Sequence, residues 1–360
     1  MTVLDPDGLG PLEDLVDARV SRGELLRRGA AAGLALSVLG VFSGRALAQA
    51  DASSSVIAIV SGGPHPYFAP WGPGTADAAR AFHVQKAEWK VPTAFTLNDQ
   101  NQLIDTLVVQ GFNAFGVFPD DVNGTNGKIA ELAGRGIPVL SLAACVAHPT
   151  KAPFCISTDV YNSAYQGTNA LIRFMGGKGA ILHGTGLLID PNTKRRIAAV
   201  KKAVAETHGK VKLVQTLTDI DDPQKADKAI NSFLAGHRKD ITGIVTTAFN
   251  PSVAAAKALV NLGDKRIKMV GIDDDPAVLD AIRKGFVNGT MAQNPYGQAY
   301  LGVYVLDLLK QGWKPKQSNT PLVDSGTFLV TKAKVGTYKQ ELKKITLGLV
   351  KNFKPKYLTR

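Results

Sequence analysis

The chain has 360 residues, of which 45% are hydrophobic and 20% are charged, and its formal net charge is +12. These proportions are ordinary for a globular protein and exclude a chain that is disordered throughout. The length is large for one hydrophobic core, so two domains are expected. The positive charge indicates a basic protein, and we expect no nucleic-acid partner from it alone.

The first 50 residues are predicted to be a signal peptide that is removed from the mature protein. Arginines precede an apolar run at residues 29–42, which is shorter than the roughly 20 residues that a membrane span needs. Small residues at Ala48 and Ala50 suit cleavage near either position. No later segment looks long and apolar enough to span a membrane, so we expect an exported, periplasmic protein.

The export route stays open between two alternatives. Residues 21–27 resemble a twin-arginine signal in which Gly23 replaces the second arginine, whereas Arg27 and Arg28 suit a general secretory signal equally well. Removing residues 1–50 leaves a net charge of +13. The densest basic run is at residues 353–360, and a solvated surface is the simplest interpretation of such runs.

Short apolar runs alternate with helical patterns through the rest of the chain, which is typical of an α/β fold with parallel sheets. The expected strands lie near residues 56–60, 93–97, 114–118, 137–142, 180–183, 211–217, 243–248, 268–272 and 289–293. The expected helices lie near residues 74–86, 99–110, 126–135, 161–175, 194–207, 224–235, 252–262, 276–284 and 296–311. These strands are too many for one small sheet, and a break is expected near residues 157–159.

The first expected strand ends in a loop that is rich in aromatic residues and prolines. Tyr67 and Phe68 are candidates to stack on the apolar face of a sugar ring, and His65 and Trp71 stand beside them. The neighbouring prolines stiffen the loop, so less entropy is lost on binding. The alternative is an aromatic cluster that caps the edge of the sheet, and for His65 and Trp71 the two alternatives are equally balanced.

The two cysteines, Cys145 and Cys155, both fall in the exported part of the chain. A close pair in an oxidising compartment is a disulfide candidate. The loop that it closes has about ten residues, which the chain-entropy account values at about 3 kcal/mol. Two free buried thiols are the alternative.

Residues 268–295 give the clearest site prediction. An apolar strand leads to Asp273, Pro276 can begin a helix that Gly285 ends, and a second strand leads to Gln293. Ligand-binding groups collect beyond the carboxyl ends of parallel strands, so Asp273 and Gln293 are candidates for polar recognition.

The two halves of the chain resemble each other. Residues 111–144 and 240–274 both read as strand, polar turn, alanine-rich helix, glycine and strand. A duplicated lobe places two sets of strand ends face to face across a cleft. Under this superposition Ala143 and Ala144 stand where the second half has Asp273 and Asp274, so we expect a chemically asymmetric cleft.

Motifs for covalent chemistry are missing from the sequence. The glycines around Lys178 lack the ending of a phosphate loop and precede a strand, and no HExxH, CxxC or nucleophile elbow occurs. The six histidines are scattered without metal-ligand spacing. We therefore expect no enzyme, no cofactor and no metal.

Five motifs occur in the order found in one family. "IAIVSGGPHPYF", "VFPDD", "GIPVLSL", "MVGIDDDP" and "GTMAQNP" resemble the ribose-binding-like, type I substrate-binding proteins of ABC transporters. The resemblance covers residues 55–330 and implies two Rossmann-like lobes joined by a three-segment hinge. The implied parts are a signal peptide at 1–50, an N-terminal lobe at 51–157 and 295–321, and a C-terminal lobe with a tail at 158–294 and 322–360. The implied hinge segments are residues 157–159, 293–295 and 321–325.

The resemblance also implies roles for individual residues. His65, Tyr67 and Phe68 match the loop that supplies a polar contact and stacking aromatics, and Phe118 falls where ribose binders usually have asparagine. Lys194 matches a family arginine that reaches ligand hydroxyls. Asp273 and Gln293 match residues that bind ligand hydroxyls. Asp221, and Phe249 or Asn250, fall on two further strand-end loops.

One departure from the family pattern concerns specificity. Pentose and hexose binders of this family usually carry Asp-Arg where this chain has Ala143 and Ala144. Each charge-assisted hydrogen bond that is lost is worth about 1.5–3 kcal/mol. We therefore expect a less hydroxylated or differently shaped ligand, such as a polyol, a deoxysugar or a related metabolite.

The resemblance implies a monomeric periplasmic receptor that delivers a small ligand to an ABC permease by hinge closure. The alternative is a ligand-sensing subunit for a chemoreceptor or a membrane kinase, which neighbouring permease and ATPase genes would argue against. A transcription regulator of the same fold would need a helix-turn-helix where the signal peptide stands.

Overall fold

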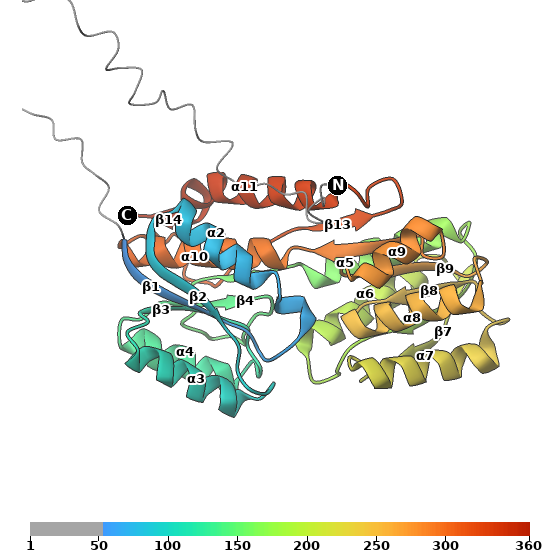
Figure 1. The fold of residues 1–360 in the computed structure, drawn as a ribbon, viewed down its shortest axis with the longest axis horizontal. Helices are drawn as coiled ribbons and strands as arrows, with labels where there is room; N and C mark the ends of the chain where they lie inside the picture. The colour runs from blue at the N-terminus through green and yellow to red at the C-terminus, as the bar shows by residue number, and fades with distance from the viewer. Residues whose placement is uncertain (1–52) are drawn as a thin grey trace, which may run out of the picture. The chain divides into compact units, whose positions relative to one another are not determined.

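The computed structural model describes residues 53–360 (Figure 1). Two six-stranded sheets lie in this part of the chain, with strand orders β12-β5-β4-β3-β1-β2 and β13-β10-β9-β8-β6-β7. The two orders correspond strand for strand, as the internal resemblance predicts. The predicted signal peptide, its cleavage position and its export route lie outside the described residues.

The first sheet is parallel throughout and belongs to the first lobe. Its strands are β1 (Ser53–Val60), β2 (Val84–Lys90), β3 (Ala114–Val117), β4 (Val139–Leu142), β5 (Cys155–Ser157) and β12 (Leu322–Asp324). Its helices are η2 (Pro66–Phe68), α2 (Trp71–Ala81), α3 (Leu97–Val109), α4 (Gly124–Gly134) and α10 (Pro295–Lys310). Two apolar clusters cover the two faces, one with α2 and α10 and the other with α3 and α4.

The second sheet repeats this arrangement, except that its last strand is antiparallel to its neighbour. Its strands are β6 (Gly179–Gly184), β7 (Val211–Leu217), β8 (Gly243–Thr246), β9 (Lys268–Ile272), β10 (Gly289–Gln293) and β13 (Thr327–Val330). Its helices are α5 (Val160–Phe174), α6 (Pro191–Ala205), α7 (Pro223–His237), α8 (Phe249–Leu262) and α9 (Pro276–Lys284). The α/β fold with two mainly parallel sheets that the sequence predicted is thereby confirmed.

Helix α9 forms for the reasons that its sequence suggests. Asp275 accepts a hydrogen bond from the amide of Ala277 at 2.8 Å and caps the helix, and Pro276 occupies its first position. Gly285 ends it with a φ of 78°, a conformation that glycine adopts without steric cost.

The expected strand at residues 93–97 was wrong, because the strand at this place is β2 (Val84–Lys90). β2 is an edge strand with little apolar periodicity, and only Val84 of its residues is fully buried. Three strands of three or four residues, β5, β12 and β13, were also missed. β5 and β12 have three residues each, which are too few to show a period.

The C-terminal helix α11 (Tyr338–Tyr357) packs against both lobes. Tyr338 and Leu342 lie in the core of the second lobe, whereas Phe353 and Leu358 lie in the core of the first. After the helix, β14 (Leu358–Thr359) pairs with β11 (Lys314–Pro315).

The observed lobes differ from the expected domain boundaries in two segments. Residues 322–324 were assigned to the second lobe, but they form β12, which pairs with β5 of the first sheet. Residues 353–360 were assigned to the second lobe as a tail, but they return to the first lobe. The cause is long-range pairing and packing, which local sequence patterns do not reveal.

Candidate functional site

The residues that follow β4 and β9 adopt the same unusual backbone conformation. Ala143 has a φ of 61° and Asp273 a φ of 66°. The amide of Ala143 donates to Ile156 O at 2.8 Å, and the amide of Asp273 donates to Met291 O at 3.0 Å. A left-handed conformation is uncommon for residues other than glycine. The two positions are therefore structural equivalents, and the second lobe carries a carboxylate where the first carries a methyl group.

Asp273 and Gln293, predicted as polar contacts, lie together at the carboxyl edge of the second sheet. Gln293 Nε2 donates to Asp273 Oδ1 at 2.8 Å, and Asp273 is only 7% exposed. Burial raises the pKa of Asp273 to about 7, although the hydrogen bond from Gln293 and the positive charge of Arg196 act in the opposite direction. A ligand group that donates a hydrogen bond would therefore stabilise the charged form of Asp273.

Helix α6 offers Arg196 to this region, while Lys194 is exposed. The charge of Arg196 lowers the pKa values of both Asp273 and Asp190, although burial raises the pKa of Asp190 overall. The Nε atom of Arg196 is buried and has no hydrogen-bond partner within residues 53–360. The sequence match selected Lys194 and missed Arg196. The two residues are two positions apart on one helix, so their side chains point to nearly opposite sides of it.

The aromatic loop of the first lobe divides into two kinds of residue. The Tyr67 hydroxyl donates to Gln298 Oε1 at 2.9 Å, and burial, followed by the charge of Asp273, raises the pKa of Tyr67. Phe68 and Trp71 are almost fully buried with ring centroids 4.9 Å apart. Phe118 packs edge-on against Phe68 at 5.2 Å. Phe68, Trp71 and Phe118 therefore form an aromatic cluster at the end of the sheet, and Tyr67 faces the charged groups of the second lobe.

The two lobes contact each other at two places in the site, of which the first is around His65. His65 Nε2 lies 4.0 Å from Asp221 Oδ1, and the His65 ring packs edge-on against Phe249 at 5.6 Å. Asp221 Oδ1 in turn accepts hydrogen bonds from the backbone and side-chain nitrogens of Asn250, at 3.0 and 3.1 Å. Burial lowers the pKa of His65 despite the nearby carboxylate. Predicted residues from three separate segments, His65, Asp221, and Phe249 with Asn250, are thus in one cluster.

The second cross-lobe contact involves the backbone of Ala143. Asn192 Nδ2 of α6 donates to Ala143 O at 3.3 Å. The same oxygen accepts a hydrogen bond from Ser157 Oγ at 2.7 Å. Ala143 therefore takes part through its carbonyl oxygen, and its side chain adds no polar group.

A buried carboxyl group in the first lobe was not predicted. Asp120 follows β3, beside Gly62 and Phe118. Neither of its carboxylate oxygens is exposed or has a hydrogen-bond partner among the described residues. Burial, and then the charge of Asp99, raises the pKa of Asp120 to about 8. The first lobe thus has a carboxyl group near the site even though Ala143 and Ala144 supply none.

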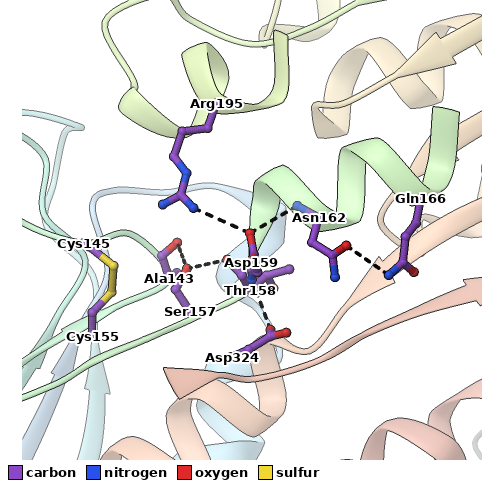
Figure 2. Close-up of polar contacts among 10 residues, drawn as sticks. All are labelled: Ala143, Cys145, Cys155, Ser157, Thr158, Asp159, Asn162, Gln166, Arg195 and Asp324. Atoms are coloured by element: carbon purple, nitrogen blue, oxygen red, sulfur yellow. Dashed lines mark hydrogen bonds and ion pairs between the residues drawn. A yellow bond between two sulfur atoms is a disulfide. The ribbon is translucent and has the colours of Figure 1, made fainter. Parts of the chain in front are cut away.

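The first hinge crossover runs from β5 into α5 (Figure 2). Asp159 Oδ1 accepts from the amide of Asn162 at 3.1 Å and caps α5, and Arg195 of α6 lies 3.6 Å from the same carboxylate oxygen. The amide of Asp159 donates to Asp324 Oδ1 at 3.1 Å, which links this crossover to the one after β12. Cys145 and Cys155 are joined by a disulfide just before the crossover (Figure 2). The sequence favoured this bond over two free thiols.

Amide side chains connect the remaining crossovers. Gln298 Nε2 donates to Thr158 Oγ1 at 3.4 Å and to Ser325 Oγ at 3.2 Å, while its oxygen accepts from the site residue Tyr67. Asn294 Nδ2 donates to Ser325 O and to Thr346 Oγ1 of α11, both at 2.9 Å. The hinge crossovers, α11 and the aromatic loop therefore share one buried polar network.

A separate pocket in the described part of the chain lies away from these residues. It has a volume of about 340 Å³ between α5 and β13, and its lining residues are Gln166, Asn169, Arg173, Met291 and Leu329. None of the strand-end residues described above lines it. The candidate site is therefore defined by the converging side chains at the strand ends.

Residues 53–360 contain neither a metal-binding cluster nor a membrane-spanning helix. No three His, Cys, Asp or Glu side chains there are grouped so that they could hold a metal ion. No helix in this range has the length and apolar character needed to cross a membrane.

The chain belongs to the periplasmic binding protein family, because the profile of the family described as a periplasmic binding protein domain matches residues 56–314. This is a family of binding proteins, and the two-lobed fold is its type I form. The xylitol-binding protein of Mycolicibacterium smegmatis is 26% identical over 219 residues, which are 60% of this chain and 61% of that protein. The match thus spans less than two thirds of that relative.

Solved structures share the fold. An ABC transporter solute-binding protein from Burkholderia graminis, in complex with D-arabinose, is 24% identical with a TM-score of 0.72, and covers 80% of this chain and 99% of its own. A periplasmic solute-binding protein from Actinobacillus succinogenes with bound D-allose is 19% identical with a TM-score of 0.72, and covers 79% of this chain and 100% of its own.

Proposed function

We propose that this protein is an exported solute-binding protein of an ABC importer, which binds a small sugar or polyol between its two lobes. The observation that carries the proposal is the convergence of Asp273, Gln293 and Arg196 with Tyr67 and His65 at the facing strand ends. Relatives described as binding xylitol, D-arabinose and D-allose support this ligand class.

The polar groups of the site suit hydroxyl groups, which both donate and accept hydrogen bonds. Carboxylates of the second lobe accept from hydroxyls, and Arg196 and Gln293 donate to them. Each bond to a charged group contributes about 1.5–3 kcal/mol. Since Ala143 offers no carboxylate, a ligand must obtain most of its charged contacts from the second lobe. A flexible polyol can arrange its hydroxyls on one side, whereas a pyranose ring presents them around its rim, so we favour a polyol such as xylitol.

Binding and release follow from hinge motion in this proposal. The cross-lobe contacts of His65 and Asn192 belong to a closed arrangement, and opening must break them. The monomeric closed form delivers the ligand to a permease in the inner membrane from the periplasm. No covalent step and no cofactor is involved, so the protein is not an enzyme.

Calorimetric titration of the purified chain tests the proposal. The ligands are xylitol, arabitol, ribose, xylose, D-arabinose, D-allose, galactose and glucose. We expect a polyol to bind at least tenfold more tightly than any of the aldoses. If none of these ligands binds, the assignment as a sugar or polyol receptor is wrong. Sub-micromolar binding of ribose, xylose, galactose or glucose would show that Ala143 and Ala144 do not set specificity.

A further inference from the structure

The positive charge of the protein is concentrated in its last 51 residues. Residues 310–360 contain twelve Lys or Arg and two Asp or Glu, whereas residues 53–309 contain 25 and 21. The C-terminal segment therefore carries a net charge of +10, out of +12 for the whole chain. The remainder of the described protein is close to neutral for its size.

Few of these charges are neutralised within the protein. Among residues 53–360, the C-terminal segment makes one ion pair, between Lys344 and Glu341 at 3.3 Å. Lys354 and Arg360 pack on the ring of Trp313, at 5.0 and 5.1 Å from its centroid. These contacts leave the positive charge in place. Like charges held close together repel one another, so an anionic partner would gain by binding here.

Six of the twelve cations belong to helix α11, which lies on an outer edge of the protein. Helix α11, drawn in red in Figure 1, runs along that edge, and its buried residues Tyr338, Leu342, Thr346 and Phe353 form an inward stripe. The opposite side of the helix carries Lys344, Leu347 and Lys351, spaced three and four residues apart and all exposed. Leu347 is 44% exposed between the two lysines.

We propose that this basic edge, defined as α11 with the basic residues of 310–360 that flank it, binds the anionic surface of a lipid bilayer. Eleven of the twelve cations are lysines, which act as point charges and suit a diffuse layer of anionic headgroups. Leu347 can enter the boundary between headgroups and acyl chains, as apolar residues of interfacial helices do. The proposal concerns this surface and holds whether or not the site between the lobes binds a sugar.

Vesicle co-sedimentation tests the proposal with the full chain. One set of vesicles contains phosphatidylcholine alone, and the other contains phosphatidylcholine with phosphatidylglycerol. We expect binding to the second set only, and a loss of at least tenfold in affinity as salt rises from about 25 to about 150 mM, because screening weakens exposed charges. Equal binding to both sets, or binding that salt does not change, would overturn the proposal.

Two matched triple variants locate the surface. The first changes Lys339, Lys344 and Lys351 to glutamine, and the control changes Lys210, Lys212 and Lys228 of the second lobe to glutamine; all six lysines are exposed. Each lysine near an anionic surface contributes about fivefold, so we expect about a hundredfold loss for the first variant and less than fivefold for the control. Equal losses would contradict the proposal. Binding to double-stranded DNA or heparin without binding to vesicles would contradict it as well.

Discussion

The two lobes share a strand order and differ in their chemistry at equivalent positions. Ala143 and Asp273 have nearly the same φ and make the same backbone bond to the next strand, but only Asp273 brings a carboxylate. Asp120 places a carboxyl group in the first lobe at a different strand end. The backbone of the duplicated unit is thus preserved where its recognition groups have diverged, so specificity cannot be read from the fold.

The largest expected effect on stability concerns the covalent difference between the two lobes. The first lobe has a disulfide, whereas the second contains no cysteine. Replacing Cys145 and Cys155 with alanine should lower the free energy of unfolding by about 3 kcal/mol, because the closed loop of about ten residues no longer restricts the unfolded chain. Urea unfolding of the variant and the oxidised wild type measures it. A change below about 1 kcal/mol would contradict the expectation.

A substitution of Arg196 tests whether the second lobe supplies the charged hydrogen-bond donor to the ligand. Arg196→Ala should weaken ligand binding by about 1.5–3 kcal/mol, or roughly 10- to 150-fold, since a charged hydrogen bond is lost. Lys194→Ala on the same helix is the control, and less than a twofold effect is expected because Lys194 is exposed. Calorimetry compares the two. A larger loss for Lys194→Ala would restore the residue that the sequence match favoured.

The third prediction concerns Asp120, the buried carboxyl group of the first lobe. Its pKa is raised from 3.8 to about 8 on folding, so the folded protein binds this proton more tightly than the unfolded chain. Its contribution to stability is therefore full below about pH 4 and is lost as the pH rises to about 8.

Asp120→Asn removes this titration. Between pH 5 and pH 8 the free energy of unfolding of the wild type should fall by at least about 1 kcal/mol more than that of the variant, after allowance for partial solvent screening. Urea unfolding at several pH values measures the difference. Parallel profiles would mean that Asp120 is paired in solution.

The smallest effect concerns α11, which joins the two lobes. Thr346→Val removes the hydroxyl that accepts a hydrogen bond from Asn294 at the hinge. The expected loss of stability is about 1 kcal/mol, because Asn294 keeps its bond to Ser325. Thr359→Val, at an exposed position near the end of the chain, is the control. If both variants have the same unfolding midpoint, α11 does not stabilise the hinge through this contact.

Local signals in the sequence account for much of the fold and part of the site. Pro276 and Gly285 mark the ends of α9, and the apolar runs before Asp273 and Gln293 correctly placed these residues at adjacent strand ends. Their hydrogen bond follows from that placement. Their roles in ligand binding stay predictions.

Features that depend on long-range packing were not accessible in this way. Arg196 and Lys194 are two positions apart on one helix, and only the packing of α6 decides which one faces Asp273. The burial of Asp120 depends on the Gly62 loop, about sixty residues away in sequence. The return of residues 353–360 to the first lobe depends on pairing between β14 and β11.

The central claim is that the second lobe supplies the dominant polar contacts of the site. Calorimetry of Asp273→Ala, with Asp280→Ala on the partly exposed side of α9 as control, tests it most directly with whichever sugar or polyol the wild type binds. The account predicts a loss of roughly 2–4 kcal/mol for Asp273→Ala, since a charged hydrogen bond disappears and a ligand group is left unpaired. It predicts no measurable loss for Asp280→Ala. An unchanged affinity for Asp273→Ala would remove Asp273 from the site and contradict the account.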